Sequence, residues 1–199
     1  LRVMEITPDR NPISGGPHHL IIRRQSRTQI VSLHDRRQGL ATTAALLREF
    51  DPDILLTEYG DRWLLPALLE ETRDFIVRPL LNRDPDMAPR VTAERSYFSY
   101  GQIFHNDQQV YLFGRHHIDR KNILFWGDYG LEGVIETARV TGLSLQKAAR
   151  STPGTGISSM QMREALRSGM LVPYKKQLPE KMRTGLNLLQ HDMGGLIFQ

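Results

Sequence analysis

The stretch Asp53-Ile-Leu-Leu-Thr-Glu-Tyr-Gly-Asp-Arg-Trp-Leu-Leu-Pro-Ala-Leu-Leu69 decides which fold the chain can adopt. Its first part, Ile54 to Thr57, is a short apolar run between Pro52 and Gly60, and this length and these bounds predict a buried strand. A turn follows, and a helix is expected from Trp63 to Glu71. Strands that end in a glycine turn before a helix are common places for chemistry in α/β folds.

The segments before this stretch predict how the sheet begins. Alternating β-rich residues indicate a strand at Leu1–Thr7, and two more strands are expected at His19–Arg24 and Thr28–Leu33, around a short polar turn. Apolar residues at helical spacing indicate a helix over Leu40–Phe50. Three strands, a helix and then the Asp53–Thr57 strand are the order in which a ribonuclease-H-like fold begins. We therefore expect an α/β protein with a mixed sheet that is flanked by helices and holds these strands together.

The second half of the chain predicts a hairpin and more helices. A loop is expected from Val77 to Arg90, because prolines alternate there with charged residues. A hairpin of Tyr97–Phe104 and Gln109–Phe113 is expected after it, with its turn at Asn106-Asp107 and with Gly114–Asp119 continuing it. A helix is expected over Leu131–Val140, with Asp128 as its cap and Gly142 as its stop. A second helix is expected from about Met160 to Ser168, where Ser158 and Gln161 have capping-box spacing.

The bulk composition excludes several classes of protein. The chain has 199 residues, of which 40% are hydrophobic, and no apolar run is long enough to span a membrane. It contains no cysteine, which excludes disulfides, cysteine metal sites and a thiol nucleophile. We therefore expect a cytoplasmic protein without a membrane partner; no leader is visible, although the chain begins at Leu1 rather than at Met.

The positive charge lies in the last quarter of the chain. From Lys147 onward there are eight Lys and Arg residues against three acidic ones, whereas the whole chain carries a net charge of +4. A basic segment on a near-neutral body favours a polyanion such as DNA, although a solvated basic surface gives the same pattern. The candidate nucleic-acid-binding residues are Arg150, Arg163, Arg167, Lys175 and Lys176.

The central stretch resembles the second exonuclease motif of family B DNA polymerases, whose pattern is roughly Asn-Gly-Asp-x-Phe-Asp-x-Pro-x-Leu. The residues that match it, with a tryptophan in the Phe place, are Gly60, Asp61, Trp63, Pro66 and Leu68. Two polar positions differ: Tyr59 stands in the place of the Asn, and Leu64 stands in the place of the metal-binding Asp. From the local pattern alone, Asp61 is expected to cap the following helix.

Later segments extend the resemblance in the same order along the chain. Tyr97-Phe-Ser-Tyr-Gly with Gly114-Arg-x-His-Ile-Asp119 is similar to strands of the exonuclease domain, and Gly194–Gln199 is similar to the strand before the first polymerase motif. The resemblance implies a degenerate 3′–5′ exonuclease-like domain at 1–143 and a helical connector at 144–199 that leads to a polymerase palm. It also implies that the partners are DNA and that palm, and that the parent polymerase uses Mg²⁺.

The metal ligands of the family's exonuclease are missing from the sequence. The family supplies them as Asp-x-Glu, an Asp in the second motif and Tyr-x-x-x-Asp, and none of these occurs here. Glu5, Glu58, Asp61 and Asp119 are the best substitutes, but each also has an ordinary role as a surface residue, cap or ion-pair partner. We therefore predict no catalytic and no metal-binding residue in this chain. A working 3′–5′ exonuclease with displaced carboxylates is the main alternative, and a free-standing basic DNA-binding module is a weaker one.

Overall fold

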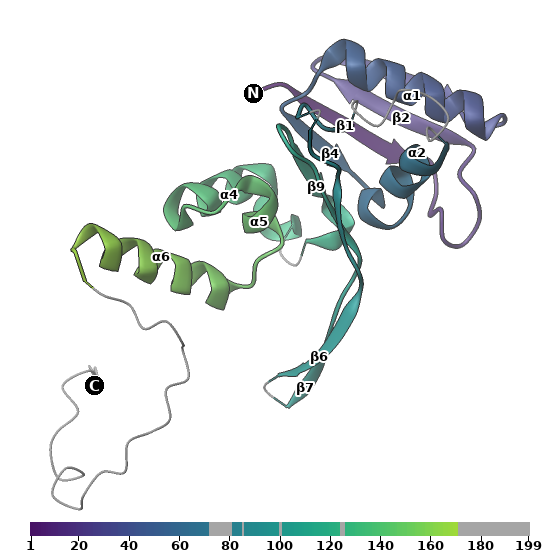
Figure 1. Ribbon diagram of the computed structural model, residues 1–199. Helices are drawn as coiled ribbons and strands as arrows, with labels where there is room; N and C mark the ends of the chain where they lie inside the picture. Colours follow the sequence, from purple (N-terminus) through teal and green to yellow (C-terminus); the bar gives the residue numbers. More distant parts are fainter. Residues whose placement is uncertain (72–80, 85, 100, 124–125, 171–199) are drawn as a thin grey trace, which may run out of the picture. The chain divides into compact units, whose positions relative to one another are not determined.

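The computed structural model describes residues 1–71, 81–84, 86–99, 101–123 and 126–170. A five-stranded sheet lies at its centre, in the order β3-β2-β1-β4-β9 (Figure 1). The strands are β1 (Val3–Pro8), β2 (His19–Arg24), β3 (Arg27–Ser32), β4 (Ile54–Thr57) and β9 (His116–Asp119).

The pairing of these strands makes the sheet mixed. β2 runs antiparallel to both β1 and β3, whereas β1, β4 and β9 run parallel to one another. Leu55 of β4 lies opposite Met4 of β1 and His117 of β9. The structure thus confirms the predicted α/β fold with a ribonuclease-H-like mixed sheet, and it confirms that the first four predicted strands share it.

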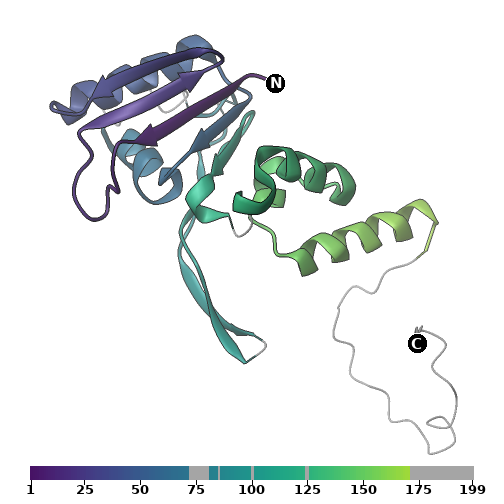
Figure 2. The same cartoon turned by 180° about the vertical axis from the view of Figure 1, so that it is seen from behind.

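Helices cover both faces of the sheet (Figure 2). α1 (Arg36–Phe50) and α2 (Leu65–Glu71) pack on one face, while α4 (Trp126–Thr141) and α5 (Leu145–Ala149) pack on the other. Because successive side chains of a strand point to opposite faces, β4 supplies Leu55 to the first core and Ile54 and Leu56 to the second. All four residues of β4 are therefore buried, as the short apolar run predicted.

The turn after β4 differs from the prediction in one respect. Helical structure begins at Gly60 as a single π-turn over Gly60–Leu64, and α2 continues from it, so the helix starts before Trp63. Tyr59 precedes it in the left-handed region, with φ 59°. A Cβ on Gly60 would collide with Thr57 Oγ1 and His117 Nε2, so only glycine fits this close approach.

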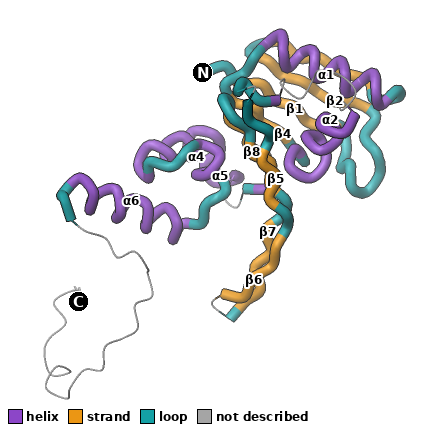
Figure 3. The backbone as a smooth tube through the Cα atoms, viewed as in Figure 1, coloured by secondary structure: helices purple, strands orange, loops and turns teal. Residues whose placement is uncertain are grey.

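The turn of the predicted hairpin is at the wrong place. The chain reverses between Ser99 and Gln102, where Gly101 takes a left-handed φ of 76°, and not at Asn106-Asp107. Gly101 and Asn106-Asp107 are both good turn formers, and the local sequence pattern does not decide between the two places. The strands are β5 (Arg90–Thr92), β6 (Arg95–Ser99), β7 (Gln102–Asn106) and β8 (Gln109–Tyr111), in which β5 pairs with β8 and β6 with β7 (Figure 3). Residues 116–119 do not continue this hairpin but form β9 of the central sheet.

The helices begin earlier than predicted. α1 starts at Arg36 because Asp35 caps it by accepting a hydrogen bond from the Gln38 N–H. α4 starts at Trp126, includes a non-helical Gly130 and ends before Gly142, whose φ is 74°. α6 (Pro153–Arg167) starts seven residues before Met160, so the predicted cap at Ser158 lies inside the helix.

The chain divides into two compact units, Leu1–Arg163 and Glu164–Gln199, and each is considered by itself. The predicted boundary at 143/144 stays a prediction. The part of the predicted connector from 171 to 199, which includes the strand at 194–199, and the first residues of the loop predicted at 77–90 lie outside the described residues. None of the helices in the described part of the chain is long and apolar enough to cross a membrane.

Candidate functional site

Three parallel strands end at the same edge of the sheet, and polar residues gather there. Ile6 of β1 lies opposite Thr57 of β4, which lies opposite Asp119 of β9. The residues that follow these three are Thr7, Glu58 and Arg120, and Glu5 precedes Thr7 on the same face of β1. The carboxyl ends of parallel strands are where α/β sheets place ligands, so this edge is the first candidate for a functional site.

Arg120 holds these residues together. It begins a short 3₁₀ turn, Arg120–Asn122, after β9, and its Nη2 lies 2.7 Å from Glu5 Oε1 and 3.1 Å from Glu58 Oε1. The same nitrogen donates to Thr7 Oγ1 at 3.2 Å. Arg120, Glu5, Glu58 and Thr7, together with the Arg23 that also contacts Glu5, are called the Arg120 cluster below. The guanidinium nitrogen thus lies among three oxygen atoms supplied by the ends of two strands.

The Arg120 cluster is partly buried and contains a second arginine. The exposed fractions of the side chains are 18% for Arg120, 20% for Glu5 and 27% for Glu58. Arg23 of β2 also reaches Glu5 Oε1, at 3.1 Å, but its side chain is 49% exposed. Two carboxylates and two guanidinium groups give the cluster no net charge, so neither glutamate is the free surface residue that the sequence suggested for Glu5.

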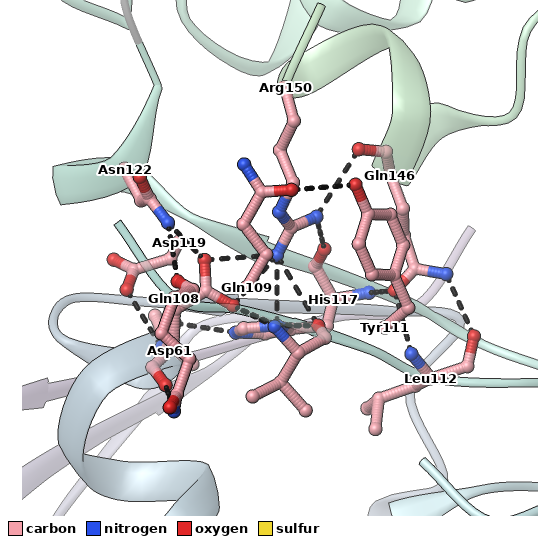
Figure 4. Close-up of polar contacts among 12 residues, drawn as sticks. Asp61, Gln108, Gln109, Tyr111, Leu112, His117, Asp119, Asn122, Gln146 and Arg150 are labelled. Atoms are coloured by element: carbon pink, nitrogen blue, oxygen red, sulfur yellow. Dashed lines mark hydrogen bonds and ion pairs between the residues drawn. The ribbon is translucent and has the colours of Figure 1, made fainter. Parts of the chain in front are cut away.

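The other two substitute carboxylates, Asp61 and Asp119, form a separate cluster (Figure 4). The Asp61 and Tyr59 N–H groups donate to Asp119 at 2.9 and 3.1 Å, and the Lys121 N–H donates to it at 3.1 Å. Asp119 therefore fixes the turn after β4 onto β9, and it does not pair with Arg115 or Arg120. Arg115 instead pairs with Asp51.

Asp61 is completely buried and its charge is balanced by Arg150. Arg150 Nη2 lies 3.0 Å from Asp61 Oδ1 and 3.2 Å from Oδ2, and its side chain is 1% exposed. Asp61 also accepts hydrogen bonds from the Val110 N–H and from Asn122 Nδ2, each at 2.7 Å. The prediction that Asp61 caps a helix is therefore wrong: its carboxylate joins β8, the turn after β9 and α5.

His117 lies beside this ion pair as a neutral side chain. Burial lowers its pKa to about 4, even though the nearby Asp61 charge acts in the opposite direction. Nδ1 lies 2.9 Å from the Val110 carbonyl, which can only accept, and 3.2 Å from Arg150 Nη2, which can only donate; the shorter contact, to the carbonyl, places the proton on Nδ1. Nε2 then accepts a hydrogen bond from the Thr57 hydroxyl at 2.9 Å.

Asp119 has a raised pKa. Burial raises it to about 6, and the neighbouring Asp61 charge acts in the same direction, whereas the hydrogen bond from the Asp61 N–H lowers it. Buried groups with shifted pKa values are found at catalytic sites and also in structural networks. Here the hydrogen bonds of Asp119 go to backbone N–H groups of its own sheet edge, which indicates a structural role.

Gln146 of α5 completes this second cluster. Its Oε1 accepts from the Leu112 N–H at 2.9 Å and from the His117 N–H at 3.1 Å, and its Nε2 donates to the Leu112 carbonyl at 2.8 Å. One buried amide thus satisfies backbone groups of β9 and of the residue after β8, which would otherwise lack partners. The cluster anchors α5 to the edge of the sheet.

The structure places the predicted DNA-binding residues in different surroundings. Arg150 is a correction: its guanidinium is buried against Asp61 and does not face a surface. Arg163 is partly buried and donates to the carbonyls of Arg139 and Val140 at the end of α4, whereas Arg167 is exposed. Lys175 and Lys176 lie outside the described residues.

Sequence reasoning found the acidic residues of both clusters but missed their basic partners. Arg120 was not among the predicted site residues, and Arg150 was predicted only as a DNA-binding residue. Thr7 and Arg120 are separated by 113 positions, so no local pattern could connect them. One feature of the sequence could have indicated the contact: Arg120 directly follows the β9 strand, just as Glu58 directly follows β4, and these strands run parallel.

Comparisons with known proteins support a polymerase-related fold. No model of a known protein family matches the chain, and no curated protein matches its sequence. Among solved structures, the chain is similar to the family B DNA polymerase from the hyperthermophilic archaeon Pyrobaculum calidifontis, with a TM-score of 0.57 and 17% sequence identity. The similarity covers 91% of this chain and 31% of that polymerase. The chain thus shares the fold of part of a family B polymerase.

The residues present do not fit the metal ions that the resemblance to an exonuclease implies. Two-metal catalysis places the ions about 3.5–4 Å apart among clustered carboxylates. In the Arg120 cluster the two carboxylates already contact a guanidinium, and Asp61 and Asp119 are engaged elsewhere by Arg150 and backbone N–H groups. Leu64, in the place of the third ligand, is fully buried in the core.

Proposed function

We propose that this chain is the exonuclease-like region of a family B DNA-directed DNA polymerase, and that it shapes the path of DNA without cutting it. The parent enzyme would join deoxynucleotides at a Mg²⁺-dependent palm that follows this region in the same chain. The observation that carries the proposal is the cation between Glu5 and Glu58: Arg120 takes the central position of the carboxylate cluster.

Two further observations support this function. The fold similarity covers 91% of this chain but 31% of the polymerase, which suits one region of a larger enzyme. The second carboxylate cluster is buried and fully paired, so it offers no open position to a metal-bound water. Buried and paired carboxylates suit a structural scaffold, whereas a metal-dependent nuclease needs carboxylates that are open to metal ions and water.

The first prediction is that the chain does not degrade DNA. A single-stranded oligonucleotide that is labelled at its 5′ end should stay full length during incubation with Mg²⁺ or Mn²⁺, because the carboxylates are neutralised by arginine. Denaturing gel electrophoresis measures the product lengths. Stepwise shortening from the 3′ end that is lost in Glu5→Gln and kept in Glu136→Gln would show that the alternative, an active exonuclease with displaced carboxylates, is right.

The second prediction concerns the basic segment. We expect weak binding to single-stranded DNA without sequence preference, because the positive charge is concentrated from Lys147 onward. Changing Lys175 and Lys176 to Ala should weaken binding and reduce the slope of log affinity against log salt by about 1.4, since each phosphate contact on a single strand contributes about 0.7. Fluorescence anisotropy at several salt concentrations measures both quantities.

The matched control removes two positive charges from the body of the domain. Arg27 and Arg48 are both exposed and lie outside the basic segment, so their double change to Ala should leave the salt slope almost unchanged. Equal effects of the two double variants would indicate binding through overall charge alone. An absence of binding at low salt would contradict the proposed contact with DNA.

A further inference from the structure

We infer, building on the function proposed above, that Arg120 acts as a built-in counter-cation which replaces a divalent metal ion, so that Glu5, Glu58 and Thr7 form a cation site that is latent in this chain. The geometry points to this substitution because one nitrogen, Nη2, makes all three contacts with the oxygen atoms. The cluster thus surrounds a single point of positive charge.

Arg120 contacts the cluster through one nitrogen and not through a bidentate pair of N–H groups. Arginine usually binds a carboxylate through two parallel N–H groups. Here its Nε is buried and has no hydrogen-bond partner among the described residues. Nη2 contacts a different oxygen atom on each of three residues, so the three oxygens surround a single positively charged nitrogen. Arg120 therefore pairs with both glutamates through one nitrogen, without forming a bidentate pair with either.

The oxygen atoms of the cluster also suit a hard cation. Carboxylate and hydroxyl oxygens bind Mg²⁺ at about 2.0–2.1 Å and Ca²⁺ at about 2.3–2.6 Å. The three oxygens lie 2.7, 3.1 and 3.2 Å from Nη2, so a contraction of about 1 Å would convert the arginine site into a metal site. The exposed fractions of about one fifth to one quarter leave room for water to complete the coordination.

Arg23 provides a matched control within the same cluster. It contacts the same oxygen, Glu5 Oε1, at 3.1 Å, but the structure records no contact between Arg23 and Glu58. Replacing Arg23 or Arg120 with Met removes one positive charge in either case. Only the loss of Arg120 removes the cation that lies between the two glutamates. The two variants therefore separate the effect of charge from the effect of position.

The experiment compares Mn²⁺ binding and thermal stability in these variants. In electron paramagnetic resonance titrations, Arg120→Met should bind one Mn²⁺ ion per chain more than wild type and Arg23→Met bind. Mg²⁺ or Mn²⁺ at ten times the dissociation constant should raise the Tm of Arg120→Met by about 4 °C. KCl at matched ionic strength should not raise it, and adding Glu58→Gln should abolish the rise.

Further variants keep the test decisive. Arg120→Lys, which retains a point charge, should bind no more Mn²⁺ than wild type binds. If Arg120→Met does not fold, Arg120→Gln makes the same comparison, because it keeps a hydrogen-bond donor without the charge. Absence of additional Mn²⁺ binding in the folded, uncharged variant would overturn this inference and leave the proposed function intact. Mn²⁺ binding and 3′ shortening by the wild type would overturn the proposed function itself.

Discussion

Replacing Arg150 with methionine is expected to lower the free energy of unfolding by about 3–5 kcal/mol, because it leaves a buried carboxylate without its cation. Asp61 is completely buried, and Arg150 Nη2 contacts both of its oxygens. Methionine matches the length of the arginine stem but brings no charge. Urea titration monitored by circular dichroism measures the loss.

Two variants show whether the uncompensated charge is the cause. The double variant Arg150→Met with Asp61→Asn should recover part of the lost stability, since it leaves no unpaired charge in the core. Arg139→Met removes an exposed ion pair with Glu136, and it should leave the stability unchanged within error. A loss below about 1 kcal/mol in Arg150→Met would place the pair in the class of surface ion pairs and contradict its structural role.

The second large effect is expected in the pH dependence of stability. His117 is neutral in the fold, and its pKa is lowered from 6.5 to about 4. Its contribution to the free energy of unfolding is therefore full above pH 6.5 and is lost as the pH falls toward 4. Asp119 has a pKa raised from 3.8 to about 6, so its contribution is full below pH 3.8 and is lost as the pH rises through 6. Each shift corresponds to about 3 kcal/mol, and in the wild type the two oppose each other.

Asp119→Asn should therefore reveal the contribution of His117. Between pH 6.5 and 4 this variant should lose about 3 kcal/mol more than the wild type loses, because the opposing contribution of Asp119 is gone while that of His117 remains. His117→Gln should show the opposite slope relative to the wild type. Urea titrations at several pH values measure these slopes whatever the absolute stability of each variant is. Parallel pH profiles for wild type and Asp119→Asn would contradict the raised pKa of Asp119.

The sequence predicted those parts of the fold that depend on local patterns. The strand at His19–Arg24 was predicted with its true bounds because a short polar turn separates it from the next strand, and the Ile54–Thr57 strand was predicted because four apolar residues lie between turn formers. The hairpin turn was misplaced because Gly101 and Asn106 are both good turn residues. The choice between them depends on how β5 and β8 pair, which is not a local property.

The candidate site was only half predictable, for a similar reason. Glu5, Glu58, Asp61 and Asp119 could be named from the sequence, but their division into two clusters depends on the order of strands in the sheet. Asp61 has the sequence position of a helix cap, yet its carboxylate is bonded to Arg150, 89 residues away. Arginine partners at such separations follow from topology, so composition and spacing do not reveal them.

The proposed function depends on a guanidinium in the place of metal ions at the carboxyl edge of the sheet. Crystals of the wild-type chain soaked in Mn²⁺ and measured at the manganese absorption edge test this most directly. We expect no anomalous peak among Glu5, Glu58 and Thr7, with Arg120 Nη2 lying between the two carboxylates. A peak within about 2.0–2.6 Å of Glu5 and Glu58 oxygens, with Arg120 displaced, would contradict it.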